Sequence, residues 1–390
     1  MRFLPYGRQT IDDDDIAAVA AALQSEYLTT GPAVAEFERA FAEATGAVCA
    51  VACNSGTAAL HLAALTLDLV PGGDAVIVPS LTFLATANVV RMCGAEVVFA
   101  DVDPDTGLMA PENLLEALSR VPAGLRAKAA IPVHLNGQIC DTASLASVAS
   151  EAGIQLVEDA CHALGADRAG ANAHSVMACF STHPVKAIAT GEGGVVTTRD
   201  GALASRLAQL RSHGMMRDPA EFASKEFAFD GDVPNPWYYE MAEYGWNYRL
   251  PDILCALGTS QLKKLPAFHA RRREIAAIYD RLLTPLAPVV RPVPHGAAAH
   301  GWHLYAILMD FAALNTTRRS VMETLRAQDI GTQVHYLPVH HQPYYRKRYG
   351  ELTLSGADAY YARCLSIPLF PSMSDQDVER VVEGLLGVCS

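Results

Sequence analysis

The sequence predicts an α/β protein built on a mainly parallel β-sheet. Short apolar runs rich in β-branched residues alternate with helical patterns between residues 47 and 211. Strands that alternate with helices form βαβ units, whose sheet is covered by helices on both faces. Ligands of such sheets bind beyond the carboxyl ends of the strands. We therefore expect the functional residues in the loops that follow strands.

The expected elements of this region follow one another along the chain. Strands are expected at Val48–Ala52, Ala75–Val78, Glu96–Val102, Lys128–His134, Gln155–Asp159, Ser175–Phe180 and Gly194–Thr198. Helices between the earlier strands are expected at Thr57–Leu67, Leu84–Met92, Pro111–Leu118 and Thr142–Glu151.

Residues 218–245 combine aromatic side chains with prolines and acids. We interpret them as a long ordered loop, and loops of this length are usually functional or disordered.

The C-terminal part is predicted to form a smaller α+β domain. A mostly helical segment, Asp252–Leu283, leads to a cluster of prolines between residues 285 and 294 that marks a break. Beyond it we expect strands at His303–Met309 and Gln333–Tyr336, and helices at Arg318–Gln328, Gly356–Leu365 and Asp375–Leu386. Residues 1–250 should therefore form a large α/β domain, and residues 251–390 a connecting helix with the smaller domain.

Charge and composition argue against several classes of partner. The 390 residues include 30 basic and 42 acidic side chains, which gives a net charge of −12 and argues against binding of nucleic acid through a basic face. Nine cysteines without a CxxC pair are typical of a reducing compartment. The N-terminus lacks the apolar stretch of a signal peptide, and no apolar run approaches the ~20 residues of a membrane helix. We expect a cytoplasmic protein with no membrane partner.

The histidines and glycines do not indicate a metal or a dinucleotide. The sequence has no HExxH pattern and no cluster of cysteine with histidine, and only the pairs His300/His303 and His340/His341 suggest ligands. We expect no metal site. The glycine-rich run Gly191–Gly194 precedes an expected strand and lacks the GxGxxG pattern, which argues against hydride transfer.

The first loop of interest is Asn54–Thr57, between an expected strand and helix. Gly56 permits a ligand to approach the backbone closely, and the N-terminus of the following helix offers free N–H groups to a phosphate. The same residues also make an ordinary helix N-cap, which is the commoner role of such a loop.

The second loop begins with Glu158 and Asp159 at the end of an apolar strand and continues to His162. A carboxylate there can hold a protonated ring nitrogen through an ionic hydrogen bond. The alternative is that the two acids only cap the following turn.

The third loop, Phe180–Lys186, carries a single lysine among small and β-branched residues. A partly desolvated lysine has a lowered pKa and attacks carbonyl groups as a nucleophile. The alternative is a surface lysine whose apolar stem packs along the protein.

The fourth loop, Gly245–Arg249, follows the aromatic segment and precedes a helix. Asn247 and Arg249 stand near a glycine and can reach a phosphate or another anion. The alternative is a plain surface turn.

In this order the four loops reproduce the layout of the pyridoxal phosphate (PLP) aminotransferases: phosphate loop, ring-nitrogen acid, Schiff-base lysine and second phosphate contact. The chain resembles the sugar aminotransferases of the DegT/DnrJ/EryC1/StrS family, and within it the branch that acts in pseudaminic acid biosynthesis. The resemblance extends from about Tyr6 to the C-terminus. The stretches that carry it include Pro5–Gln9, Tyr27–Pro32, Asn54–Leu60, Thr82–Asn88, Glu158–Gly165, Phe180–Gly194, Arg211–Met215, Asn247–Leu250, Ala256–Leu262 and Gln333–Tyr336.

The resemblance implies the fold type I architecture of aspartate aminotransferase, with the large domain binding PLP. It implies that Lys186 is the catalytic residue, which binds the cofactor covalently and then carries the proton between cofactor and substrate. Asp159 would keep the pyridine nitrogen protonated. The implied cofactor-binding residues are Gly56, Thr57, Phe83, Asp159, His162, Ser181, Lys186 and Asn247. Asn247 would come from the partner subunit, so that a homodimer shares its active sites.

The implied substrates are L-glutamate and a nucleotide-linked 4-keto-6-deoxy sugar. In the pseudaminic acid branch this sugar is UDP-2-acetamido-2,6-dideoxy-β-L-arabino-hexos-4-ulose, aminated at C4. The implied substrate-binding residues are Tyr6, Glu26, Tyr27, Leu28, Thr29, Gly56, Asn247, Gln333, Val334, His335 and Tyr336. His183 belongs to the motif, and a packed histidine is at least as consistent with it as a substrate contact.

Three positions depart from the pattern of the family. His162 stands where many members have Gln, and histidine is common there in the pseudaminic acid branch. Thr182 replaces a usual Phe, and Gly56 stands where this branch often has Ala.

The alternatives to this function are an aminotransferase for a dTDP- or GDP-linked sugar, a dehydratase or aromatising enzyme of the family, and a non-catalytic regulator. The family's sugar 3-dehydratases replace the lysine with histidine, so Lys186 argues against them. Intact Asp159, Lys186 and Asn247 argue against a regulator.

Overall fold

The computed structural model describes residues 2–296 and 300–389. A seven-stranded sheet forms the centre of the large domain, in the order β1-β7-β6-β5-β4-β2-β3. β7 runs antiparallel to both of its neighbours, and the remaining pairs are parallel. The strands are β1 (Cys49–Cys53), β2 (Asp74–Pro79), β3 (Glu96–Ala100), β4 (Arg126–Ala130), β5 (Gln155–Asp159), β6 (Met177–Ser181) and β7 (Gly194–Thr198). The predicted α/β class is confirmed.

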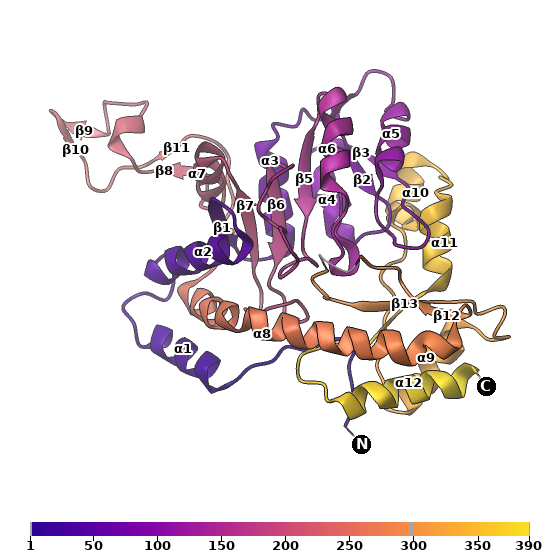
Figure 1. Ribbon diagram of the computed structural model, residues 1–390. Helices are drawn as coiled ribbons and strands as arrows, with labels where there is room; N and C mark the ends of the chain where they lie inside the picture. Colours follow the sequence, from indigo (N-terminus) through magenta and orange to yellow (C-terminus); the bar gives the residue numbers. More distant parts are fainter. Residues whose placement is uncertain (1, 297–299, 390) are drawn as a thin grey trace.

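Helices cover both faces of this sheet (Figure 1). Successive side chains of a strand point to opposite faces, so Val76 and Val78 of β2 pack with α3, α4 and α7, whereas Ala75 and Ile77 pack with α5 and α6. These two apolar layers hold the strands rigid beneath the loops at their carboxyl ends. The helices are α3 (Gly56–Thr66), α4 (Leu84–Met92), α5 (Pro111–Ser119), α6 (Thr142–Glu151) and α7 (Gly201–Leu210).

The long helix α8 (Asp252–Leu283) connects the two parts of the chain (Figure 1). Two N-terminal helices, α1 (Asp13–Leu23) and α2 (Pro32–Thr45), pack on it. Asp12 caps α1, and Gly46 ends α2 in the left-handed conformation that glycine adopts without strain. Asp252, at the start of α8, accepts hydrogen bonds from the N–H groups of Gly31 (2.7 Å) and Ala33 (2.9 Å) and so anchors the segment before α2.

The smaller C-terminal domain is an antiparallel sheet with helices packed on it. Its strands lie in the order β12 (Val290–Pro292), β13 (Tyr305–Met309) and β14 (Cys364–Ile367). Its helices are α9 (Arg318–Ala327), α10 (Pro343–Tyr349), α11 (Ser355–Arg363) and α12 (Asp375–Cys389), and short 3-10 turns occur at Leu135–Gly137, Pro219–Glu221, Thr284–Leu286 and Val339–His341. A separate apolar core joins β13, α9 and α12 to the second half of α8.

Residues 215–241 form an arm that projects from the body of the molecule (Figure 1). It contains two short antiparallel pairs, β8 (Met215–Met216) with β11 (Glu240–Met241), and β9 (Phe229–Asp230) with β10 (Val233–Pro234). The predicted long loop is therefore ordered, as expected, and it carries short strands that its sequence did not indicate.

Some boundaries and elements differ from the prediction. The expected helix Gly356–Leu365 ends at Arg363, because Cys364–Ile367 pairs with β13 as a buried strand. Gln333–Tyr336 is not a strand: only Gln333 pairs, with Ser366, before the chain turns into the cavity described below. β4 ends at Ala130, two residues before Pro132, which has no N–H to donate. Helices α1, α2, α7 and α10 and strand β12 were not predicted.

No helix within residues 2–296 and 300–389 is both long and apolar enough to cross a membrane.

Candidate active site

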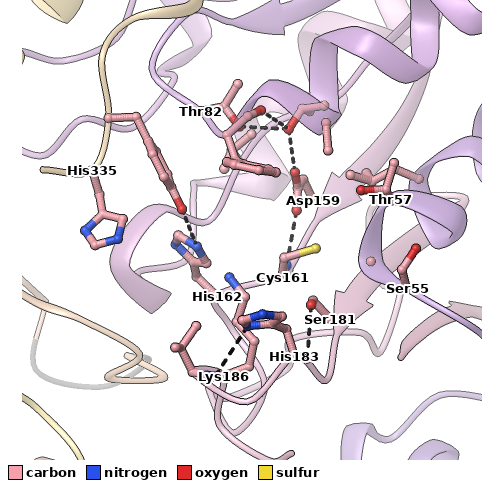
Figure 2. Close-up of a pocket in the computed structure, with 18 of the residues that line it drawn as sticks. Ser55, Thr57, Thr82, Asp159, Cys161, His162, Ser181, His183, Lys186 and His335 are labelled. Atoms are coloured by element: carbon pink, nitrogen blue, oxygen red, sulfur yellow. Dashed lines mark hydrogen bonds between the residues drawn. The ribbon is translucent and has the colours of Figure 1, made fainter. Parts of the chain in front are cut away.

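A cavity of about 580 Å³ lies where loops from both domains meet. Its walls come from the loops after β1, β2, β5 and β6 and from residues 333–336 of the smaller domain. Figure 2 shows Ser55, Thr57 and Ser181 on one side of the cavity, His335 on the other, and Asp159, His162 and Lys186 between them. The position beyond the carboxyl ends of parallel strands is the one predicted for this fold.

One end of the cavity suits an anion. Ser55 caps α3 by accepting a hydrogen bond from the N–H of Ala58 (3.1 Å), while the N–H groups of Gly56 and Thr57 belong to the helix end, where no intrahelical acceptor exists. Ser181 faces this end from β6. A Cβ placed on Gly56 would lie 2.8 Å from Cβ of Ser181, so glycine permits the close approach of α3 and β6. A helix N-terminus with nearby hydroxyl groups binds phosphate.

Asp159 is a buried carboxylate at the end of β5, with 5% of its surface exposed. Thr86 donates a hydrogen bond to Oδ2 at 2.7 Å, and the N–H of Cys161 donates to Oδ1 at 3.2 Å. Thr82 in turn contacts the hydroxyl of Thr86 at 2.8 Å. These donors fix the carboxylate in one orientation at the cavity wall.

Lys186 follows β6 in the loop before β7 and is partly buried in the cavity. Burial lowers the pKa of its amino group, although Cys161 and Asp159 act in the opposite direction. Its backbone N–H donates to the carbonyl of His183 at 2.8 Å, which fixes the turn that carries it. A larger neutral fraction makes this amine a nucleophile.

His162 is buried beside Asp159 and Lys186. Its Nε2 is 3.1 Å from the hydroxyl of Tyr336, and its ring lies 4.4 Å from that of His303. Nδ1 of His162 is buried without a hydrogen-bond partner among the described residues. Burial, reinforced by the charge of Lys186, holds the pKa of His162 well below its usual value, so the ring is neutral.

The smaller domain supplies the opposite wall. The rings of Tyr6 and His335 are 5.3 Å apart, and Ser366 holds Nδ1 of His335 at 2.8 Å. The carbonyl of Tyr6 accepts the N–H of Leu369 at 3.0 Å, which ties the N-terminal segment to this domain. Burial lowers the pKa of His335 to about 3 and raises that of Tyr6, so both groups are neutral hydrogen-bonding groups near pH 7.

The cavity brings together most of the residues that the sequence analysis selected. It includes Tyr6, Gly56, Thr57, Phe83, Asp159, His162, Ser181, Lys186, Gln333, Val334, His335 and Tyr336. Five others do not line it: Asn247 and the run Glu26, Tyr27, Leu28 and Thr29 are exposed on the surface of the single chain. The carbonyl of Asn247 accepts a 3.4 Å hydrogen bond from the amide of Asn54, which places its backbone next to the loop before α3.

The sequence reasoning gave no role to Thr82, Thr86 and Cys161, which also line the cavity. The available signal was weak, because Thr82 lies in the loop before the expected helix Leu84–Met92 and Thr86 in its first turn, where threonine is an ordinary residue. The contact of Thr86 with Asp159 spans 73 residues of sequence and becomes visible only in the folded chain.

The fold and the cavity together define a PLP-dependent transferase of fold type I. The model of the "DegT/DnrJ/EryC1/StrS aminotransferase family" matches residues 9–386, and the chain belongs to this family. A protein of Bacillus subtilis (strain 168), "Spore coat polysaccharide biosynthesis protein SpsC", is 39% identical over 388 residues, which are 98% of this chain and 96% of that protein.

Solved structures of aminotransferases resemble the whole chain. "Helicobacter pylori PseC, aminotransferase involved in the biosynthesis of pseudoaminic acid" has a TM-score of 0.89 at 27% identity and covers 99% of both chains. The PLP form of the "putative sugar aminotransferase Spr1654 from Streptococcus pneumoniae" has a TM-score of 0.87 at 27% identity, covering 99% of this chain and 98% of that one. The protein is therefore a sugar aminotransferase whose cofactor is PLP.

The residues of the cavity fit this cofactor. The N-terminus of α3 with Thr57 and Ser181 offers donors to a phosphate, and Asp159 offers a fixed acceptor to a protonated nitrogen. The unpartnered Nδ1 of His162 is a polar atom that a bound ligand can satisfy.

Proposed function

We propose that this protein transfers the amino group of L-glutamate to C4 of a nucleotide-linked 4-keto-6-deoxy sugar, namely UDP-2-acetamido-2,6-dideoxy-β-L-arabino-hexos-4-ulose. The observation that carries the proposal is one cavity that is lined by Lys186 and Asp159 together with the polar pair Tyr6 and His335. The similarity to the PseC aminotransferase supports the choice of sugar.

The residues on the side of the cavity next to the sheet would hold the cofactor. Gly56, Thr57 and Ser181 would bind its phosphate, Asp159 would keep its ring nitrogen protonated, and His162 would contact its ring oxygen. Phe83, 55% exposed at the cavity, would stack on its ring. Bound there, PLP supplies the electron sink of the reaction.

Lys186 performs the proton transfers. Because burial lowers its pKa, Nζ is neutral in a larger fraction of molecules than a surface lysine and accepts a proton from the reacting carbon. Its backbone is held by the turn at His183, which fixes the point of the cavity wall from which Nζ reaches the substrate.

The sugar nucleotide occupies the wall formed by the smaller domain. Tyr6, Gln333, Val334, His335 and Tyr336 line this wall, and their neutral hydroxyl, amide and imidazole groups suit sugar hydroxyls and phosphate oxygens. Glu26, Tyr27, Leu28 and Thr29, exposed in the single chain, complete the binding site for the nucleotide in the assembled enzyme.

The active enzyme is a homodimer in which Asn247 of one subunit binds the cofactor phosphate of the other. Asn247 is exposed and follows the arm of residues 215–241, which carries Trp237 with 74% of its surface exposed. The exposed large apolar side chains of this arm are Phe227, Val233, Trp237, Tyr239 and Met241, and Tyr244 is exposed three residues beyond it. Burial of such side chains favours association.

Two further proposals complete this assignment. The boundary between the domains lies at residue 250, just before α8 begins at Asp252. The cytoplasmic location remains a prediction from cysteine usage.

The proposal is tested by two half-reactions with a stoichiometric amount of enzyme. The enzyme is incubated with ¹⁵N-glutamate, freed of it, and mixed with UDP-, dTDP- or GDP-linked 4-keto-6-deoxy sugars. Mass spectrometry then detects the labelled amino sugar. Transfer to the UDP-N-acetyl sugar alone is expected. Transfer to a dTDP or GDP sugar would replace the substrate, and no release of 2-oxoglutarate from glutamate would favour the dehydratase or the regulator.

A further inference from the structure

Glu158 and Asp159 are consecutive on β5, so their side chains point to opposite faces of the sheet. Asp159 lines the cavity, whereas Glu158 is absent from its walls and is 5% exposed. There Nε2 of His134, which is fully buried, lies 2.9 Å from Oε2 of Glu158. The assignment of the active site gives this buried pair no role.

The hydrogen bonds of His134 define its protonation. The backbone N–H of Cys140 donates to Nδ1 at 3.2 Å, so Nδ1 must carry a lone pair and Nε2 the proton. Burial lowers the pKa of His134, whereas Cys140 and Glu158 raise it, to about 10. A second proton would nevertheless have to displace the N–H of Cys140 from Nδ1, so the geometry favours a neutral ring whose Nε2–H donates to the ionised Glu158. Although burial raises the pKa of Glu158, the hydrogen bond from His134 holds that pKa below its usual value.

The loop of residues 131–134, which follows β4 and carries His134, also holds the backbone of Asp159. The N–H of Asp159 donates to the carbonyl of Pro132 at 2.9 Å, and the N–H of His134 donates to the carbonyl of Asp159 at 3.1 Å. The loop thus continues the parallel pairing beyond β4, where Pro132 interrupts the strand. The ring of His134 ties this loop to Glu158 on one side and to Cys140 on the other.

We propose that His134 and Glu158 are positioning residues that hold the carboxylate of Asp159 in place for the ring nitrogen of the cofactor. This inference rests on the proposed role of Asp159. The chain of contacts is short: the imidazole fixes residues 132–134, these residues fix both backbone groups of Asp159, and Thr86 and Cys161 orient its side chain.

Stability alone is a weak reason for such a pair. A buried carboxylate loses its hydration, and apolar residues of similar volume are often as stable or more so. If the pair positions Asp159, its loss should weaken PLP binding by more than the accompanying loss of folding stability explains.

The test uses two variants of His134 that distinguish the hydrogen bond at Nδ1 from the hydrogen bond at Nε2. His134→Asn retains an acceptor near Nδ1 for Cys140 and loses the donor to Glu158, whereas His134→Gln retains a donor near Nε2. His134→Asn should weaken PLP binding about tenfold, at the lower end of the range for residues that support ligands of a bound group. It should also shift the pH dependence of the cofactor absorbance. His134→Gln should restore the affinity to within about threefold.

The control is Tyr279→Phe, which removes a buried 2.9 Å hydrogen bond to Pro368 in the smaller domain. It should lower the melting temperature of the cofactor-free protein and leave PLP affinity unchanged. The inference is overturned if His134→Asn lowers only the melting temperature, as the control does.

Asp159→Asn separates this inference from the role on which it rests. If Asp159→Asn leaves affinity and absorbance unaltered, the proposed role of Asp159 fails as well. If Asp159→Asn changes them and His134→Asn does not, only the positioning role fails. No sugar enters any of these measurements, so an error in the proposed substrate does not affect them.

Discussion

The hydroxyl of Thr86 donates a 2.7 Å hydrogen bond to Oδ2 of Asp159 across the wall of the cavity. Thr86 belongs to the first turn of α4 and Asp159 to the end of β5, so this contact joins a helix to the strand that carries the proposed anchor of the cofactor. It explains how a carboxylate that is 5% exposed keeps a single orientation.

Thr86→Val should weaken PLP binding by roughly tenfold, because the carboxylate of Asp159 loses the donor that orients it. The lost hydrogen bond to a charged group should also lower the free energy of unfolding by about 1.5–3 kcal/mol. Equilibrium dialysis with PLP and urea unfolding measure the two effects. Thr66→Val is the control, since Thr66 is also buried, with 9% of its surface exposed, but bonds to Ala63 inside α3. Equal affinities of the two variants would contradict the role of Thr86.

Lys186→Ala should abolish amino transfer while the fold is retained. The side chain is partly buried, and its loss removes the amine that we propose both binds the cofactor covalently and moves the proton. Reduction with borohydride should fix PLP to the native chain and not to the variant, as seen by intact-mass measurement. Lys347→Ala, at an exposed position, should behave as the native protein. Transfer by Lys186→Ala above background would remove Lys186 from its role.

Gly56→Ala should weaken PLP binding by about tenfold, because the new Cβ would lie 2.8 Å from Cβ and 3.1 Å from Oγ of Ser181 and displace a donor to the phosphate. Gly201→Ala, at the start of α7 with no atom within 4 Å of its added Cβ, should have no such effect. The pair Gly56→Ala with Ser181→Gly should bind PLP as Ser181→Gly alone does. If the losses of PLP affinity in the two single variants add up in the double variant, Gly56 and Ser181 act separately.

Acid should destabilise the protein partly through His61. Burial lowers the pKa of His61 to about 4, whereas an unfolded histidine titrates near 6.5. The unfolded chain therefore binds the extra proton between these values, and stability falls as the pH decreases from about 6.5 to about 4, by about 3 kcal/mol for this residue. His61→Asn keeps an atom near Nδ1 for Tyr248, 3.1 Å away, and should flatten the dependence.

Urea unfolding between pH 4.5 and 7 measures this slope. His174→Asn, at an exposed position, should leave it as in the native chain. If His61→Asn has the native slope, His61 does not carry the effect.

A mixture of inactive variants should regain activity if Asn247 serves the partner subunit. Lys186→Ala and Asn247→Ala are each expected to be inactive. Random reassociation of equal amounts of the two variants gives about half mixed dimers. In each mixed dimer one of the two sites combines an intact Lys186 with an intact Asn247 from the other subunit. The mixture should therefore regain about a quarter of the native activity. The measurement is the rate of labelled amino sugar formation after mixing and refolding. No recovery, with mixed dimers demonstrated by native mass spectrometry, would place Asn247 in its own subunit's site or outside it.

Much of the fold could be read from local patterns. The expected strands at Gln155–Asp159 and Gly194–Thr198 and the helices at Leu84–Met92 and Thr142–Glu151 coincide with β5, β7, α4 and α6. The error at Cys364–Ile367 has a tertiary cause. Cys364 and Leu365, expected as the end of a helix, instead begin this strand because β13 offers an edge to pair with, and pairing satisfies the backbone of its four buried residues.

The order of the loop motifs along the chain determined the class of enzyme and selected most of its candidate residues from among those that line the cavity, because residues such as Asp159 and Lys186 are recognised by their type and by their place after a strand. Only the folded chain decided which groups support them. Thr86 reaches Asp159, His134 reaches Glu158, and Tyr336 reaches His162 across 73, 24 and 174 residues. Periodicity and spacing report local conformation, whereas these contacts arise from packing between elements that are distant in sequence.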